Sequence, residues 1–124
     1  DNRNYEADWG EKWQGLLVEG NMEGKGDGTT NYDNQANQLL AGELKGKLLI
    51  THGSMDNNVP PSNTMLVVEA LIKANKDFDM ILFPNQRHGY GNMTNYMTRK
   101  RWDYFITHLR KEVPPKEFDL ANFK

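Results

Sequence analysis

The sequence has 124 residues, with 15 basic and 17 acidic side chains and no cysteine. A formal net charge of −2 gives no electrostatic reason to expect a nucleic acid or an anionic membrane as partner. The lack of cysteine excludes a disulfide framework, a cysteine metal site and a cysteine nucleophile, and leaves the redox compartment open. Apolar stretches such as residues 65–68 are far too short to predict a membrane span, and no signal pattern opens the chain. We therefore expect one soluble domain that begins inside a longer protein.

The first part of the chain has weak secondary-structure signals. Residues 5–17 are expected to form a short helix, because large apolar side chains recur at about every fourth position: Tyr5, Trp9, Trp13 and Leu16 or Leu17. The glycine-rich stretch 18–30 is predicted to be a flexible loop, since it offers no buried face. Residues 31–40 form a weaker helix candidate that ends near Gly42.

The middle of the chain predicts a strand, a helix and a second strand. The strands are expected at 48–51 and 80–83, where short apolar runs end in turn residues. The helix between them is expected to be capped by Ser62 or Asn63, with a polar stripe formed by Glu69, Lys73 and Lys76. Two strands joined by a helix are predicted to be parallel, with a right-handed crossover.

The last part of the chain predicts a long helix and a tail. The helix is expected to begin at Thr94 or Asn95, to end before the two prolines at 114–115 and to precede a tail over 113–124. Its apolar stripe contains Trp102, Phe105, Ile106 and Leu109. Two parallel strands alone would leave both sheet edges unpaired, so the chain is expected to be part of a larger sheet.

The loops after the two predicted strands carry the candidate chemistry. Asp56 follows the first strand and His88 follows the second, and open α/β sheets place their chemistry at the carboxyl ends of strands. In α/β-hydrolases the triad runs Ser, Asp, His along the chain, with the serine in an upstream G-x-S-x-G turn that is absent from these 124 residues. A serine hydroxyl needs a base and an acid that orients the base, which are the roles predicted for His88 and Asp56.

Each of these side chains also has an ordinary structural interpretation. A loop histidine is often solvated, and an aspartate after a strand is a common turn residue. His52 is assigned to structure because the triad needs one base, and His108 is expected to be solvated on the polar side of the last helix. The three histidines are scattered along the chain, so no metal site is predicted.

Two segments carry a family resemblance. LLITHGSMDNNVPP (residues 48–61) and ILFPNQRHGYG (81–91) resemble the closing third of the catalytic domain in the prolyl oligopeptidase family, in particular its dipeptidyl peptidase IV branch. The resemblance implies a serine peptidase that joins an α/β-hydrolase domain to a β-propeller. Residues 1–124 would then be a C-terminal fragment of the peptidase domain, with Asp56 and His88 as triad acid and base.

The resemblance also implies substrate-binding residues. Asn58 matches an asparagine that helps to hold a substrate carbonyl, and Val59 lies beside the proline-binding pocket in the family pattern. Trp9 and Trp13 match two pocket tyrosines spaced four apart. This departure would reshape the pocket and puts strict proline preference in question.

The resemblance further implies a peptide substrate, no cofactor, and partners in the missing N-terminal part of the catalytic domain and in the propeller. A periplasmic or secreted location rests on the resemblance alone. The fold class is thus a partial α/β-hydrolase without its nucleophile strand, and the chain by itself is expected to be inactive. Alternatives are an esterase or acylaminoacyl peptidase, a receiver-type module phosphorylated on Asp56, and a non-catalytic assembly piece or homo-oligomer paired through its sheet edges.

Overall fold

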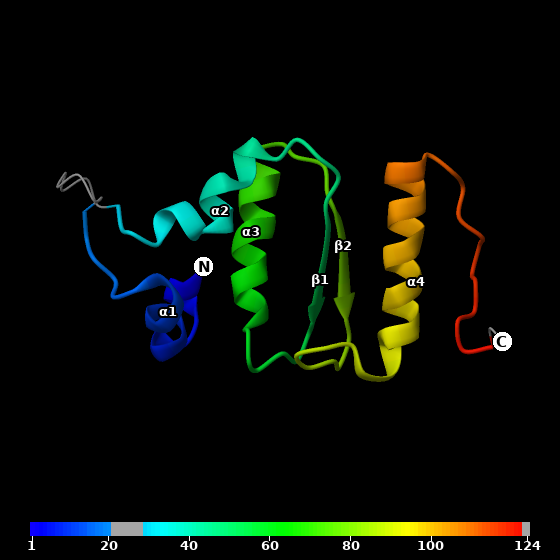
Figure 1. Cartoon of the computed structure of the whole chain (residues 1–124), viewed down its shortest axis with the longest axis horizontal. Helices are drawn as coiled ribbons and strands as arrows, with labels where there is room; N and C mark the ends of the chain where they lie inside the picture. Colours follow the sequence, from blue (N-terminus) through cyan, green and yellow to red (C-terminus); the bar gives the residue numbers. More distant parts are fainter. Residues whose placement is uncertain (21–28, 123–124) are drawn as a thin grey trace. The chain divides into compact units, whose positions relative to one another are not determined.

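The structure, a computed structural model, describes residues 1–20 and 29–122. The chain divides into two compact units, which are described separately below. Unit 1 contains Asp1–Gly46 and Val59–Asp77, and unit 2 contains Lys47–Asn58 and Phe78–Lys124. Figure 1 shows the elements of both units in chain order.

Unit 1 begins with the 3-10 turn η1 (Asn2–Asn4) and helix α1 (Ala7–Gln14). The prediction of one helix over 5–17 is wrong at both ends: Tyr5 precedes α1, and Gly15 ends it with a φ of 77° that a glycine adopts without strain. Leu16 and Leu17 therefore lie beyond the helix and are exposed. The hydroxyl of Tyr32 donates a hydrogen bond to the carbonyl of Gly15 at 2.6 Å and so ties the end of α1 to the unit.

The helical candidate at 31–40 consists of three short pieces: η2 (Asp33–Gln35), α2 (Asn37–Leu40) and η3 (Ala41–Glu43). Both α2 and η3 pack against α3 (Pro61–Lys73), on which Leu71 is buried. The predicted cap of α3 is wrong, because Ser62 and Asn63 lie inside the helix. The helix starts instead with a proline at its first position, where the missing N–H costs no hydrogen bond.

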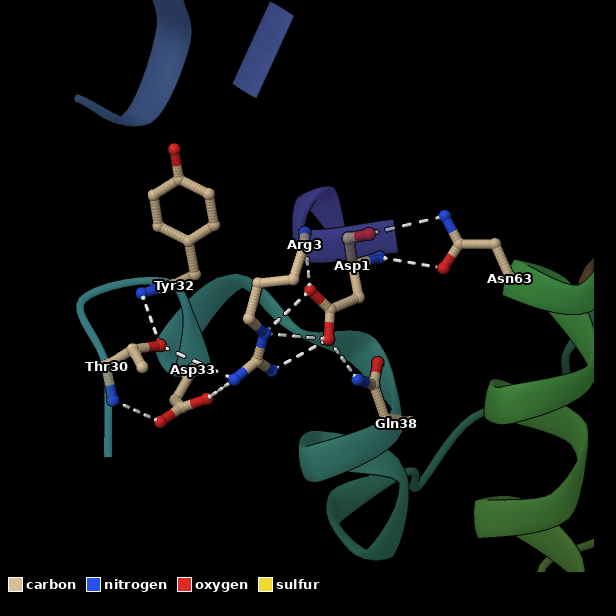
Figure 2. Close-up of polar contacts among 7 residues, drawn as sticks. All are labelled: Asp1, Arg3, Thr30, Tyr32, Asp33, Gln38 and Asn63. Carbon is tan, nitrogen blue, oxygen red and sulfur yellow. Dashed lines mark hydrogen bonds and ion pairs between the residues drawn. The ribbon is translucent and has the colours of Figure 1, made fainter. Parts of the chain in front are cut away.

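A polar network joins the beginning of unit 1 to residues 30–38 (Figure 2). The guanidinium of Arg3 contacts the carboxylates of Asp1, at 2.7 Å, and of Asp33. The backbone N–H of Thr30 donates to Asp33 Oδ2 at 2.6 Å. This backbone hydrogen bond, together with the hydrogen bond and charge of Arg3, lowers the pKa of Asp33.

The predicted glycine-rich loop is paired at its base. Glu19 and Thr30 form an isolated antiparallel bridge, and the N–H of Gly20 donates to the carbonyl of Thr29 at 2.7 Å. Residues 21–28 of the predicted loop lie outside the described residues. The ends of the 18–30 stretch are thus ordered by backbone hydrogen bonds.

Unit 2 is built on two parallel strands, as predicted. Strand β1 (Leu49–Gly53) pairs with β2 (Asp79–Phe83), and the register places Gly53 opposite Phe83. Each strand differs from its predicted range by only one or two residues at its ends. Both strands run in the same direction, so their carboxyl ends meet at one edge.

The 3-10 turn η4 (Gly91–Met93) leads into helix α4 (Thr94–Phe105), which lies beside the strands and continues as the π-helical turn η5 (Ile106–Arg110) (Figure 1). The helix does end before the prolines, but its immediate stop is Lys111, which has a φ of 60°. Of the predicted apolar stripe, Trp102, Phe105 and Leu109 are all at least half exposed, whereas Ile106 is half-buried. The buried residue of α4 is Met97.

Within the parts that the structure describes, none of the helices combines the length and apolar character needed to cross a bilayer.

Candidate active site

The site lies at the carboxyl ends of β1 and β2. After Gly53 the chain turns sharply, and the N–H of Asp56 donates to the carbonyl of Gly53 at 3.2 Å. This turn leaves the side chain of Asp56 only 6% exposed. Its Oδ1 accepts a hydrogen bond from the backbone N–H of Asn58 at 2.9 Å, which fixes one side of the carboxylate.

His88 comes from the loop after β2, and its Nδ1 lies 2.9 Å from Asp56 Oδ2. A neutral imidazole carries one ring proton, and a carboxylate can only accept. The contact therefore places that proton on Nδ1 and makes Nε2 the acceptor atom of the ring. The side chain of His88 is 59% exposed, whereas that of Asp56 is 6% exposed. The buried carboxylate of Asp56 thus orients an exposed imidazole whose Nε2 can accept a proton.

Three hydrogen bonds connect the two loops. The N–H groups of Ser54 and Met55 donate to the carbonyls of Phe83 and Gln86, each at 2.9 Å. The N–H of Asn85 donates to Ser54 Oγ, also at 2.9 Å. These three bonds hold the loop that carries His88 against the turn that carries Asp56.

Gly53 allows this close approach. A Cβ atom at this position would lie 2.3 Å from the carbonyl oxygen of Arg87 and 2.5 Å from that of Gln86. Only a residue without a side chain fits between β1 and the loop after β2. This packing role of Gly53 was not predicted from the sequence.

The far end of the second loop is attached to the sheet by Tyr90. Its hydroxyl lies 2.7 Å from Thr51 Oγ1, and its ring packs on the buried ring of Phe83 with centroids 5.0 Å apart. The loop turns through Asn85 and Gly89, which both have positive φ. Residues 84–90 are therefore held at both ends, with His88 between them.

The other two histidines are in different surroundings. His52, on β1, has Nε2 3.5 Å from Asp56 Oδ2, and its side chain is 9% exposed. The structural role expected for His52 did not include this contact, although its position four residues before Asp56 is a signal for it. The expectation that His108 is solvated is wrong, because it is half-buried and its ring packs edge-on against Tyr104 at 4.3 Å.

The predicted pocket residues are divided between the units. Asn58 is in unit 2 beside Asp56, while Val59, Trp9 and Trp13 belong to unit 1. The two indole rings pack edge-on at 5.9 Å and are 50% and 64% exposed. The ammonium of Lys12 lies 5.9 Å and 5.1 Å from their ring centroids, within reach of a cation–π interaction. The substrate-binding roles of these residues stay predictions.

Several known proteins are similar to this chain. A family model described as "Prolyl oligopeptidase family" matches residues 1–112. Dipeptidyl peptidase family member 1 of Caenorhabditis elegans is 28% identical over 108 residues, which are 87% of this chain and 12% of that protein. Human dipeptidyl peptidase 8 is 36% identical over 42 residues, which are 34% of this chain and 5% of that protein.

Solved structures that are similar to this chain are also of dipeptidyl peptidases. The crystal structure of Porphyromonas gingivalis dipeptidyl peptidase 4 matches with a TM-score of 0.50 and 43% identity, over 56% of this chain and 10% of that chain. A Bacteroides ovatus protein assigned as a dipeptidyl aminopeptidase IV matches with a TM-score of 0.69 and 26% identity, over 85% of this chain and 14% of that chain. The described chain thus corresponds to a small part of each relative.

The parallel strand pair with its helices is part of an α/β-hydrolase fold of the dipeptidyl peptidase type. The family match leaves the receiver-type alternative without support. Because the family model covers nine-tenths of the sequence, and because relatives and solved structures agree with it, the chain belongs to the prolyl oligopeptidase family.

Proposed function

We propose that the protein containing this chain is a serine peptidase of the dipeptidyl peptidase kind, in which Asp56 and His88 are the acid and base of a Ser-Asp-His triad. The observation that carries the proposal is the 2.9 Å contact between Asp56 Oδ2 and His88 Nδ1, in a chain of this family. The two residues are 32 positions apart and come from separate strand-ending loops.

In the proposed reaction, His88 Nε2 takes the proton of a serine hydroxyl as that oxygen attacks the scissile carbonyl. The ring becomes an imidazolium, and the carboxylate of Asp56 stabilises it through the Nδ1 proton without itself being protonated. The imidazolium then gives its Nε2 proton to the leaving amine, and an acyl-enzyme remains. Water attacks this ester in the second half-reaction, again with His88 as base.

The serine must come from another part of the protein, because the 124 residues contain no G-x-S-x-G turn. We therefore expect the isolated chain to be inactive. Nucleophile and oxyanion donors each contribute several kcal/mol of transition-state stabilisation in enzymes of this class.

The proposed substrate is a peptide from which a dipeptide is released at the N-terminus, since the relatives above are named dipeptidyl peptidases. Asn58 would bind a substrate carbonyl, and Val59, Trp9 and Trp13 would line the pocket for the residue before the cleaved bond. Indoles are larger than phenols, so we expect a smaller or reshaped pocket and a weaker preference for proline.

A fluorophosphonate probe tests the proposal, because it labels a serine only where a functional base activates it. We expect the full-length protein to be labelled, and the Asp56→Asn and His88→Gln variants and the isolated 124-residue chain to stay unlabelled. An unlabelled full-length protein would contradict the peptidase assignment, and labelling of the isolated chain would contradict its inactivity. Faster turnover of a simple acyl ester than of an X-Pro amide would favour the esterase alternative.

A further inference from the structure

We infer that His52 is a positioning residue, whose Nε2–H faces Asp56 Oδ2 and holds this carboxylate in place for His88. The inference rests on the proposed function, because it concerns how the acid of the same triad is oriented. It assigns a role to the second histidine of the site, which the mechanism above does not use.

The carboxylate of Asp56 has groups arranged around both oxygens. Oδ1 accepts from the N–H of Asn58 at 2.9 Å. Oδ2 faces two imidazoles, with His88 Nδ1 at 2.9 Å and His52 Nε2 at 3.5 Å. The second distance is longer than a good hydrogen bond, so the contribution of His52 is mainly electrostatic. Together these groups oppose rotation of the carboxylate about its terminal torsion.

The chemistry of the imidazole decides its tautomer. A carboxylate oxygen has only lone pairs to offer, so an unprotonated Nε2 facing it would bring two lone pairs together. A neutral His52 therefore carries its proton on Nε2 and points an N–H at Asp56. With this tautomer, the N–H groups of both His52 and His88 face the same oxygen, Asp56 Oδ2.

Burial separates the roles of the two histidines. The side chain of His52 is 9% exposed, whereas that of His88 is 59% exposed. His52 lies on β1, in register with Leu82 of β2, and so it is held by the sheet rather than by a loop. Side chains on rigid elements orient a functional group more accurately than those on loops.

The same three side chains do not form a metal site. Across residues 1–20 and 29–122, no group of three or more His, Cys, Asp or Glu is arranged to hold a metal ion. Asp56 Oδ2 and His88 Nδ1 face each other at 2.9 Å.

The test compares variants of the full-length protein that remove or keep an N–H donor at position 52. His52→Phe and His52→Met remove the N–H and replace the imidazole with an apolar side chain of similar bulk. His52→Gln keeps an N–H close to the position of Nε2. His108→Phe is the matched control, because it makes the same change at a half-buried histidine that contacts Tyr104 instead of the site.

We expect the donor-free variants to lower kcat on an X-Pro amide about tenfold, with KM nearly unchanged, because a charge-assisted contact at the long end of its range is lost. His52→Gln should recover most of the rate, and His108→Phe should behave as wild type. In an Asp56→Asn background, His52→Phe should cause no further loss, since its effect acts through that carboxylate. Equal losses in the Phe, Met and Gln variants, or an undiminished loss in the Asp56→Asn background, would overturn the inference.

A second measurement separates this inference from the proposed function. The downfield proton resonance of His88 Nδ1–H reports the contact with Asp56 by NMR whether or not the protein cleaves peptides. We expect this resonance to shift or broaden in the donor-free variants and to be preserved in His52→Gln. A wild-type protein with no turnover would refute the proposed function alone, whereas an unchanged resonance in His52→Phe and His52→Met would refute the role of His52.

Discussion

Replacing Gly53 with alanine should separate the two halves of the site. The added Cβ would lie 2.3 Å and 2.5 Å from two backbone carbonyl oxygens of the loop after β2, and real Cβ atoms keep about 3.0 Å from such atoms. Backbone atoms cannot rotate away as a flexible side chain does. The loop must therefore move by at least about 0.7 Å, the difference between 3.0 Å and 2.3 Å.

This movement is large compared with the contact that it disturbs. Asp56 Oδ2 and His88 Nδ1 are 2.9 Å apart. If the loop moved about 0.7 Å along the line that joins these two atoms, they would be about 3.6 Å apart, which is too far for a hydrogen bond. A misplacement of about 1 Å can lower the rate about 10²-fold. We expect Gly53→Ala to reduce kcat/KM by roughly 10- to 100-fold, which corresponds to about 1.4–2.7 kcal/mol of transition-state stabilisation. Overpacking should also lower the free energy of unfolding by about 1–3 kcal/mol.

Steady-state kinetics and urea unfolding of the full-length protein measure both effects. Gly46→Ala is the matched control, because a Cβ at Gly46 would meet nothing within 4 Å and the residue has no positive φ. This control should be close to wild type in rate and stability. A Gly53→Ala variant with wild-type kcat/KM and an unchanged denaturation midpoint would refute the packing role of this glycine.

Three further predictions concern charge and proton binding. Asp56→Asn should lower kcat about 10⁴-fold with a small change in KM, because the amide favours the wrong tautomer of His88; a loss below tenfold in steady-state kinetics would contradict this role. The backbone N–H of Thr30 and the guanidinium of Arg3 lower the pKa of Asp33 (Figure 2). The ionised carboxylate therefore stabilises the folded state above the ordinary carboxylate pKa, and this stabilisation is lost as the pH falls through the pKa of Asp33 in the folded state. Asp33→Asn should flatten that acid limb in urea titrations, and an identical limb would argue against the network. The pKa of Tyr104 is raised by burial and then by the charge of Asp79, so Asp79→Asn should shift its ultraviolet titration to lower pH, and no shift would exclude the charge effect.

The sheet and the pairing of acid and base could be predicted because the chain provides local signals for them. Residues 48–51 and 80–83 are short apolar runs that end in turn residues, and parallel strands bring their carboxyl ends to one edge. The proximity of Asp56 and His88 follows from this topology. Their 2.9 Å separation does not follow from it, because it depends on the hydrogen bonds between the two loops.

Periodicity predicted the presence of α1 and α4 but not every helix end or the buried residue of α4. Trp102, Phe105 and Leu109 repeat with helical spacing and are exposed, whereas the buried residue of α4 is Met97, which lies outside this repeat. Periodicity shows that a helix has an apolar face and does not show which neighbour covers it. Similarly, the end of α1 depends on the positive φ of Gly15, which the apolar spacing did not reveal.

The site divides into parts that depend on side chains and parts that depend only on the backbone. Two bonds that attach the loop carrying His88 run to the backbone carbonyls of Phe83 and Gln86 and so tolerate many different side chains, whereas the bond from the N–H of Asn85 needs the hydroxyl of Ser54. Gly53 is a further exception, because the space beside it is filled by backbone. Pro84 and Arg87 are exposed and their side chains should vary with little effect on the position of His88. An insertion of one residue between β2 and His88 should be far more damaging than either substitution, since it would change which carbonyl reaches Met55 and thereby move the imidazole away from its carboxylate.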